Sequence, residues 1–515
     1  MKQCRFEYGG YRCKEVEVVH SLCAFHDPSL DKDATKIQER LEERIQETAN
    51  DKTLILDGSI FTGGVSFHKM VFSCSVSFSL AEFHGKKTNF SAAEFRGVST
   101  NFSLAQFHAE LTDFEEAKFF SKATYFYRAQ FHGTTTRFTF AEFHSEATHF
   151  IEAAFSARVT NFLGVRFYGE TTYFGLSELN GIISFILSEF HSKTTDFSSV
   201  RISGTVSFYN NLPDSISNKC LLSFRNIVVN EKGYLIFDGV NLSKTELLAA
   251  DLARVKFLDV KWNHAARSWA GRWRSRPYDE ALWRERRQKA KLADSRERRQ
   301  KEANDADLVY LAELARLSRQ LKAYYRQTGE YQLVGHFHYG LMEMQWHQRE
   351  LEHQPQADVS HRRRLWLWLK RKSRKWISWE AAYRYSSGYG ESYVRSASVL
   401  GLVILVFTGV YWWLGVPAPP RMEVLPWFSI GPFTAEGLPY ISPGDLSGLH
   451  QTSFWKHGLA ALAYSLQTAS LGRLVYFKDS FPQSPLAEIA YTFESILGPV
   501  RIAFFVVALR NRFRR

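Results

Sequence analysis

Three cysteines and one histidine near the start of the chain have the spacing of a metal site. The pattern C-x8-C-x9-C-x2-H places the candidate ligands at Cys4, Cys13, Cys23 and His26. Three thiolates and an imidazole suit a closed tetrahedral zinc site, and a segment this short needs a metal because it has little core of its own. We expect a structural zinc in residues 1–30, with Gly9 and Gly10 forming a tight turn between the first two ligands. The alternative is a set of chance thiols in an N-terminal tail.

Two charged residues interrupt the last apolar run of the chain, residues 486–509. Glu494 and Arg501 are seven residues apart and therefore lie close to one face of a helix. A charge at the centre of a bilayer costs ~2.5–3.5 kcal/mol on insertion scales, so both side chains should face protein or water. Two interpretations remain open: the pair lines or gates a pore, or it packs against a neighbouring short helix.

Sequence motifs for catalysis are missing. The chain has no nucleophile elbow, no Walker loop, no HExxH and no GxGxxG after a strand. Its 5 cysteines are too few for a disulfide scaffold, and the N-terminus shows no secretory signal. We therefore predict that the protein is not an enzyme.

The elements that carry these residues begin with a long internal repeat. From Phe78 to Phe167, phenylalanines recur in alternating steps of five and seven residues. Most of them have Ala or Thr two positions earlier. Residues i−2 and i share one face of an extended strand, so a small and a large residue both point inward. This pattern does not fit a helical period. It predicts a coil of short strands.

Two twelve-residue units would supply four flat faces and complete one turn in 24 residues. Equivalent phenylalanines of successive turns then stack about 4.8 Å apart. Outward positions after the Phe carry His84, His108 and His132, which would lie above one another. Such a column could bind metal or respond to pH. The alternative is a polar surface that repeats because the coil repeats.

A regular period of five residues follows, without the longer step, at Leu242, Leu247, Leu252, Phe257 and Trp262. With Ala250-Asp251-Leu252 as an A-[D/N]-L core, residues 54–262 resemble pentapeptide-repeat proteins. The resemblance implies a right-handed quadrilateral β-helix. The step of seven residues departs from the plain repeat, and we interpret it as two extra residues at alternate corners.

Three segments outside the repeat have helical patterns. We expect a helical linker at 31–53, a charged helical linker at 263–306 and a helical hairpin at 307–353, with Gly329 ending its first helix. The charged linker carries Trp among many Arg, which could contact nucleic acid. A solvent-exposed helix with ion pairs along its surface, or a contact with anionic lipid, fits its mixed charges better.

Two apolar runs have the length of membrane spans, 396–416 and 486–509. The first would be about 31 Å long at ~1.5 Å per residue, matching a ~30 Å bilayer core. Both outer flanks are basic and the connection is not, which predicts an inner or plasma membrane protein with both termini in the cytoplasm. In the basic juxtamembrane segment 361–395, the residues expected to contact anionic lipid are Arg362, Arg363, Arg364, Lys370, Arg371 and Lys372.

The connection, residues 417–485, contains an apolar helix too short to span. Over 385–511, the order helix, short re-entrant helix, Thr-containing loop, helix resembles the pore module of two-transmembrane potassium-channel-like proteins. Similar stretches are Tyr464-Ser-Leu-Gln-Thr468, Asp479-Ser-Phe-Pro-Gln-Ser-Pro485 and Glu494-x-x-x-Gly498. The resemblance implies filter-like positions at Thr468, Ala469, Ser470, Leu471 and Gly472. The Gly-Tyr-Gly of such filters, which supplies permissive backbone geometry, is not present here.

These features predict a channel-like, homo-oligomeric membrane protein whose cytoplasmic rod senses or binds something, with a protein partner on the outer surface of the rod. The alternative is a non-conducting, membrane-anchored scaffold that binds proteins. A third idea comes from pentapeptide-repeat proteins that mimic DNA. Mimicry needs an acidic surface, whereas the outward residues are mixed in charge, as at Lys86, Glu110 and Arg137. Nucleic acid is therefore not an expected partner.

Overall fold

The computed structural model describes residues 3–15, 22–29, 32–48, 53–209, 220–266, 273–292, 297–352, 379–414, 458, 461–462, 464–466, 468–469 and 485–513. The chain forms two compact units. The first comprises residues 1–265 and 274–324, and the second comprises residues 266–273 and 325–515.

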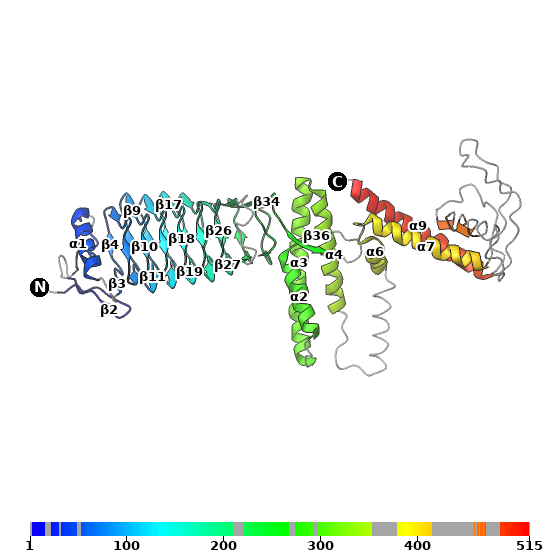
Figure 1. Ribbon diagram of the computed structural model, residues 1–515, viewed down its shortest axis with the longest axis horizontal. Helices are drawn as coiled ribbons and strands as arrows, with labels where there is room; N and C mark the ends of the chain where they lie inside the picture. The colour runs from blue at the N-terminus through cyan, green and yellow to red at the C-terminus, as the bar shows by residue number, and fades with distance from the viewer. Residues whose placement is uncertain are drawn as a thin grey trace. The chain divides into compact units, whose positions relative to one another are not determined.

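A four-sided β-solenoid dominates the first unit (Figure 1). It runs from β3 (Leu54–Ile55) to β34 (Val255–Leu258) and forms four parallel sheets of six, nine, eight and nine strands. One coil consists of β8 (Glu82–Phe83), β9 (Lys87–Asn89), β10 (Glu94–Phe95) and β11 (Ser99–Asn101). Strand β10 pairs with β14 (Lys118–Phe119) so that Phe95 lies opposite Phe119, 24 residues later. The predicted coil of about 24 residues is confirmed.

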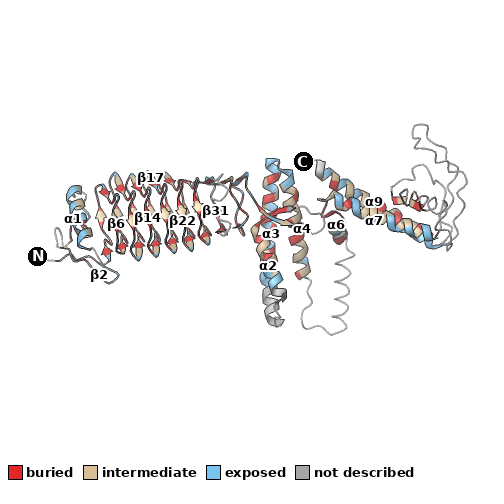
Figure 2. Cartoon of the chain, viewed as in Figure 1, coloured by how far each residue is buried: buried red, intermediate tan, exposed pale blue. Residues whose placement is uncertain are grey.

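Phenylalanine columns fill the interior of the solenoid, as the buried residues in Figure 2 show. Phe126 stacks between Phe102 and Phe150, with ring centroids 5.0 and 4.7 Å away. Rings of different columns meet edge to face, as Phe126 does with Phe138 at 86°. The small residue two positions before each Phe is buried with it, as predicted. Stacking within columns and edge contacts between columns both suit the quadrupole of the ring.

The corners of the coil alternate in type. Leu80, Leu104, Arg128 and Glu152 occupy tight turns after a Phe, with φ between 54 and 61°. This left-handed conformation is costly for residues with a Cβ. Hydrogen bonds between coils hold it, such as that from Leu80 N to Ser103 O at 3.0 Å. The longer step of seven residues contains a three-residue strand and a wider bend, which agrees with extra residues at alternate corners.

The N-terminal segment covers open strand edges of the first coil. Helix α1 (Ala34–Glu47) presents Gln38, whose side chain donates to Ser66 O at 2.8 Å and accepts from Ser66 N at 3.0 Å. Arg44 of the same helix donates to Ile55 O at 2.7 Å. Phe25 O accepts from Ile60 N at 2.7 Å. Three of the four sheets therefore end in hydrogen bonds to this segment, which blocks further strand pairing there.

The other end of the solenoid is covered by the described residues of the first unit that follow the last coil, 263–265, 274–292 and 297–324. Strands β35 (Asn263–Ala266) and β36 (Trp273–Arg276) pair with each other, and α2 (Tyr278–Leu292) and α3 (Glu297–Thr328) follow. Asp279 accepts hydrogen bonds from Leu247 N at 2.9 Å and Leu248 N at 3.2 Å, and burial raises its pKa to about 6. The Tyr324 hydroxyl contacts both N and O of Phe257. The segment expected as a charged linker thus closes the rod in its described part.

The second unit is helical. It contains α4 (Tyr331–Glu352), α6 (Trp379–Ser387), α7 (Tyr393–Leu414) and α9 (Pro485–Phe513). Gly329, at φ +83°, follows the end of α3, as the sequence predicted. Arg384 of α6 makes a bidentate ion pair with Glu343 of α4, with N–O distances of 2.7 and 3.0 Å. Helices α7 and α9 pack against each other, and both are long and apolar enough to cross a membrane.

Candidate metal centre

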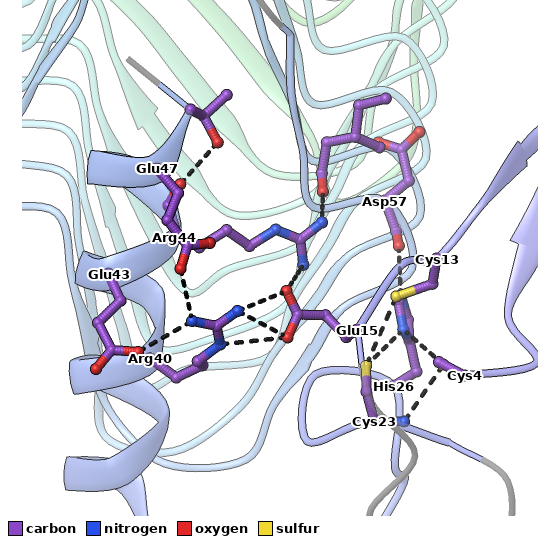
Figure 3. A network of polar contacts seen from close by, with 12 residues as sticks. Cys4, Cys13, Glu15, Cys23, His26, Arg40, Glu43, Arg44, Glu47 and Asp57 are labelled. Atoms are coloured by element: carbon purple, nitrogen blue, oxygen red, sulfur yellow. Dashed lines mark hydrogen bonds and ion pairs between the residues drawn. The ribbon is translucent and has the colours of Figure 1, made fainter. Parts of the chain in front are cut away.

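The four predicted metal ligands converge at the N-terminal end of the solenoid (Figure 3). The antiparallel hairpin of β1 (Glu7–Tyr8) and β2 (Tyr11–Arg12) brings two of the cysteines together. Its turn residues, Gly9 and Gly10, have φ values of 57 and 81°, the geometry of a type I′ turn. The third cysteine and the histidine lie on a turn that leads toward α1. All four side chains are buried.

The spacing of the four ligand atoms fits a tetrahedral zinc ion. A tetrahedron with Zn–S bonds of about 2.3 Å and a Zn–N bond of about 2.0 Å has edges of about 3.8 Å between sulfurs and about 3.5 Å between sulfur and nitrogen. Cys13 Sγ and Cys23 Sγ are 3.8 Å apart, and Cys4 Sγ and His26 Nδ1 are 3.5 Å apart. The Cys23 Sγ–His26 Nδ1 distance of 3.1 Å is a few tenths shorter. This buried cluster could therefore bind a metal such as zinc.

The surroundings of His26 orient it as a ligand. Its Nε2 lies 2.9 Å from the carbonyl oxygen of Asp57, so the Nε2–H tautomer leaves Nδ1 free to face the sulfurs. The ring stacks on Phe6 with centroids 3.9 Å apart. Gly58, at φ +63°, makes room for Phe6, because a Cβ there would lie 2.3 Å from the Phe6 ring. Neither Phe6 nor Asp57 was among the predicted site residues.

The polarity of the cluster also suits a cation. The thiols of Cys13 and Cys23 share a hydrogen bond. This bond lowers the pKa of Cys13 and, together with burial, raises the pKa of Cys23 to about 12. The backbone N–H of Cys23 donates to Cys4 Sγ at 3.3 Å. A bound divalent cation would displace the remaining thiol protons, because only thiolates coordinate zinc.

Charged residues tie the metal segment to α1. Arg40 contacts Glu15 through two nitrogens at 3.2 Å, and it also reaches Glu43 and Glu47 (Figure 3). Arg44 reaches Glu15 at 3.6 Å in addition to its bond with the first coil. The metal ligands, α1 and the first strands therefore form one connected end of the rod.

The histidine column forms as predicted. His108 stacks between His84 and His132, with centroids 4.8 and 5.0 Å away. The Nε2 atoms pair with side chains two residues earlier on the same strands, as His108 does with Gln106 at 3.1 Å. The Cys3His cluster is the one group of metal-ligand geometry found among the described residues. The geometry therefore gives the column no support as a metal site.

Other predicted site residues belong to the second unit. Glu494 and Arg501 are on α9, and the Glu494 carboxyl hydrogen-bonds Ser465 of the short helical segment between residues 458 and 469. Thr468 and Ala469 are helical. The remaining filter-like positions and the lipid-contact residues lie outside the described residues: Ser470, Leu471, Gly472, Arg362, Arg363, Arg364, Lys370, Arg371 and Lys372.

Comparison with protein-family models, with curated proteins and with solved structures finds no match for this chain. The resemblances to pentapeptide repeats and to a potassium-channel pore module therefore stay predictions from the sequence.

Proposed function

We propose that the protein is a channel-type membrane protein, assembled from several copies of the chain, with a zinc-capped β-solenoid as a cytoplasmic binding rod. The observation that carries this proposal is the docking of a short helical segment against both long apolar helices, α7 and α9. A helix, a short helix that does not span and a second helix are the parts from which a pore module is built.

The surfaces of α7 and α9 support a membrane location. At about 1.5 Å per residue, the 22 residues of α7 are about 33 Å long, enough to cross a bilayer core of ~30 Å. Leu405 and Trp413 of α7 are 64% and 72% exposed, and Phe493 and Ile496 of α9 are 60% and 59% exposed. A core helix of a soluble protein would bury such side chains, whereas lipid or other subunits would cover them.

The short segment packs tightly between the two helices. Tyr464 meets Tyr411 of α7 edge to face at 4.9 Å and Tyr491 of α9 at 6.2 Å. Close approach is possible because Gly498 has no side chain: a Cβ there would lie 2.3 Å from Ala469 Cα. This packing sets Ala469, one of the filter-like positions that the resemblance implies, beside α9, and so it supports the proposal.

Topology and assembly follow from charge and surface. The basic flanks of the two spans support cytoplasmic termini, which would put the solenoid in the cytoplasm. The Nε and Nη1 atoms of Arg501 are buried and have no hydrogen-bond partner within the described residues. A neighbouring copy of the chain, which would also cover the exposed apolar surface of α9, could supply that partner. The regular coils support the assignment of the solenoid to the pentapeptide-repeat class.

Ion flux through liposomes tests the channel proposal. Full-length protein reconstituted into vesicles should dissipate an imposed cation gradient, and Glu494→Ala should change the rate. Glu488→Ala, at an exposed position on the same helix, is the matched control. Vesicles that contain inserted, folded protein and show no flux under any imposed voltage would refute conduction.

A non-conducting scaffold remains the second candidate because Thr468 and Ala469 are helical. A filter of carbonyl rings requires non-helical backbone at such positions, and its usual glycines are missing. On this alternative the membrane helices only anchor the rod. Chemical cross-linking of the full-length protein in its native membrane should then give one defined protein adduct on the solenoid, and reconstituted vesicles should stay silent.

A further inference from the structure

We infer that Glu494 is a proton-binding site: its carboxyl group is held as a neutral acid that donates a hydrogen bond to Ser465 and so ties the short helical segment to α9. This inference rests on the membrane location proposed above. It assigns a ligand, the proton, to a residue that the sequence analysis interpreted as lining or gating a pore, or as packing against the short helix.

Burial of the carboxyl group is complete. Glu494 is 0% exposed, whereas Phe493 beside it on α9 is 60% exposed. The group therefore points away from the lipid-facing side of the helix and into the contact with the short segment. Gly498, one turn later, brings Ala469 within contact of α9 and closes that side of the site.

The hydrogen bonds around Ser465 favour a neutral acid. Its hydroxyl has a single proton and lies 3.1 Å from the carbonyl oxygen of Ile404, as well as within hydrogen-bond distance of Glu494 Oε1. When Ser465 donates to Ile404, the contact with Glu494 is favourable only if the carboxyl group is the donor. A carboxylate there would place two acceptors around one proton.

Compensation for a negative charge on Glu494 is limited to neutral hydroxyl groups, those of Ser465 and Tyr411. Among the described residues, no Lys, Arg or His adds a cation to the surroundings of the carboxyl group. The titratable groups that face it are phenols: Tyr411 of α7, Tyr464 of the short segment and Tyr491 of α9.

Arg501 does not supply a positive charge next to the Glu494 carboxyl group. It lies two turns further along α9 and forms a cation–π contact with Phe504 at 6.0 Å. An isolated ionised carboxylate in such surroundings would pay its full desolvation cost, so taking up a proton is the favourable response. Release of the proton would set the carboxylate against the Ile404 carbonyl and loosen the short segment.

Infrared spectroscopy of the full-length protein in detergent micelles tests the inference. At about pH 6 an exposed glutamate, with a pKa of about 4.3, is ionised. The wild-type protein should then show a carbonyl band of protonated carboxylic acids. In Glu494→Gln this band should weaken by the contribution of one group, and Asp279, whose pKa is about 6, accounts for the remainder. Glu488→Gln is the control and should leave the band in place. Identical bands in the wild type and Glu494→Gln would overturn the proposal.

Labelling with dicyclohexylcarbodiimide decides the matter if Glu494→Gln fails to fold. The O–H of a neutral carboxylic acid adds across a C=N bond of the reagent, the proton goes to nitrogen and the acylisourea rearranges to a stable N-acylurea. Mass spectrometry at about pH 6 should find one label on Glu494 and none on Glu488. No label on Glu494, or equal labelling of both residues, counts against a neutral acid.

Extraction of membranes with alkaline carbonate tests membrane insertion separately, so failure of the proposed function and failure of this inference are distinguishable.

Discussion

Replacement of one residue of the candidate zinc site should unfold one end of the rod and leave the rest intact. In Cys23→Ser the cluster loses a thiolate that lies 3.8 Å from Cys13 Sγ and 3.1 Å from His26 Nδ1. A serine hydroxyl does not ionise at neutral pH and is a poor ligand for zinc. We expect purified wild-type protein to contain one zinc per chain and the variant to contain none.

The size of the effect follows from what the site connects. Structural zinc supplies about 10–16 kcal/mol of folding free energy in zinc-finger peptides. Here the ligands hold Phe25, whose carbonyl accepts from Ile60 N, and His26, which bonds the Asp57 carbonyl. Loss of the metal should therefore abolish amide protection in residues 3–48 and reduce it in the first coil. The coils beyond the first have their own backbone hydrogen bonds to adjacent coils. Their amides should remain protected from exchange, because each coil contacts only its neighbours.

Elemental analysis and hydrogen exchange followed by mass spectrometry measure both parts. X-ray absorption at the zinc edge should show three sulfur ligands at about 2.3 Å and one nitrogen at about 2.0–2.1 Å. Cys220→Ser is the matched control, since Cys220 is buried in the solenoid far from the cluster in sequence and contacts Thr195 at 3.6 Å. Full zinc content in Cys23→Ser, or protection lost in Cys220→Ser but kept in Cys23→Ser, would refute the reasoning.

Three further predictions concern the core, the far cap and the short helical segment. Phe126→Ala should cost about 3–5 kcal/mol and increase hydrogen exchange in its own and adjacent coils, because its ring is stacked on both sides; unchanged exchange there would contradict the stacking. Burial raises the pKa of Asp279 to about 6, above its value of about 3.9 in an unfolded chain, so the cap should lose about 3 kcal/mol of stability as pH rises from about 3 to about 7. Thermal unfolding across this pH range should show the loss in the wild type and not in Asp279→Asn. Gly498→Ala should displace the short segment and expose it to proteolysis, whereas Gly401→Ala, with nothing within 4 Å of its new methyl group, should not.

The repeat could be derived from the sequence because its cause is local and periodic. A strand alternates its side chains with period two, so Thr88 and Phe90 had to share one face, and both are buried. The 24-residue period then fixed which rings stack, and His84 and His108 lie above each other for the same reason. The Cys3His spacing was equally informative, because four strong ligands in a short segment leave few other uses.

The partners of these residues could not be derived in the same way. Nothing in the sequence around Gln38, Asp57 or Tyr324 marks them as residues that cover strand edges or orient a metal ligand. Their roles depend on which backbone groups the fold leaves open, such as the N–H and C=O of Ser66 and Phe257. The same holds for Asp279, which looked like one charge in a solvated linker and is buried against Leu247.

The sequence by itself determined the rod, its Phe columns, the ligand set near Cys4 and two membrane-length apolar runs, because each is a pattern of residue types along one stretch. Only the tertiary structure decided how the rod ends and what Glu494 contacts. Those contacts join residues far apart in the chain, such as Glu494 with Ser465. A buried polar group takes whichever partner packing brings to it, and that choice is made by the folded backbone and not by local sequence.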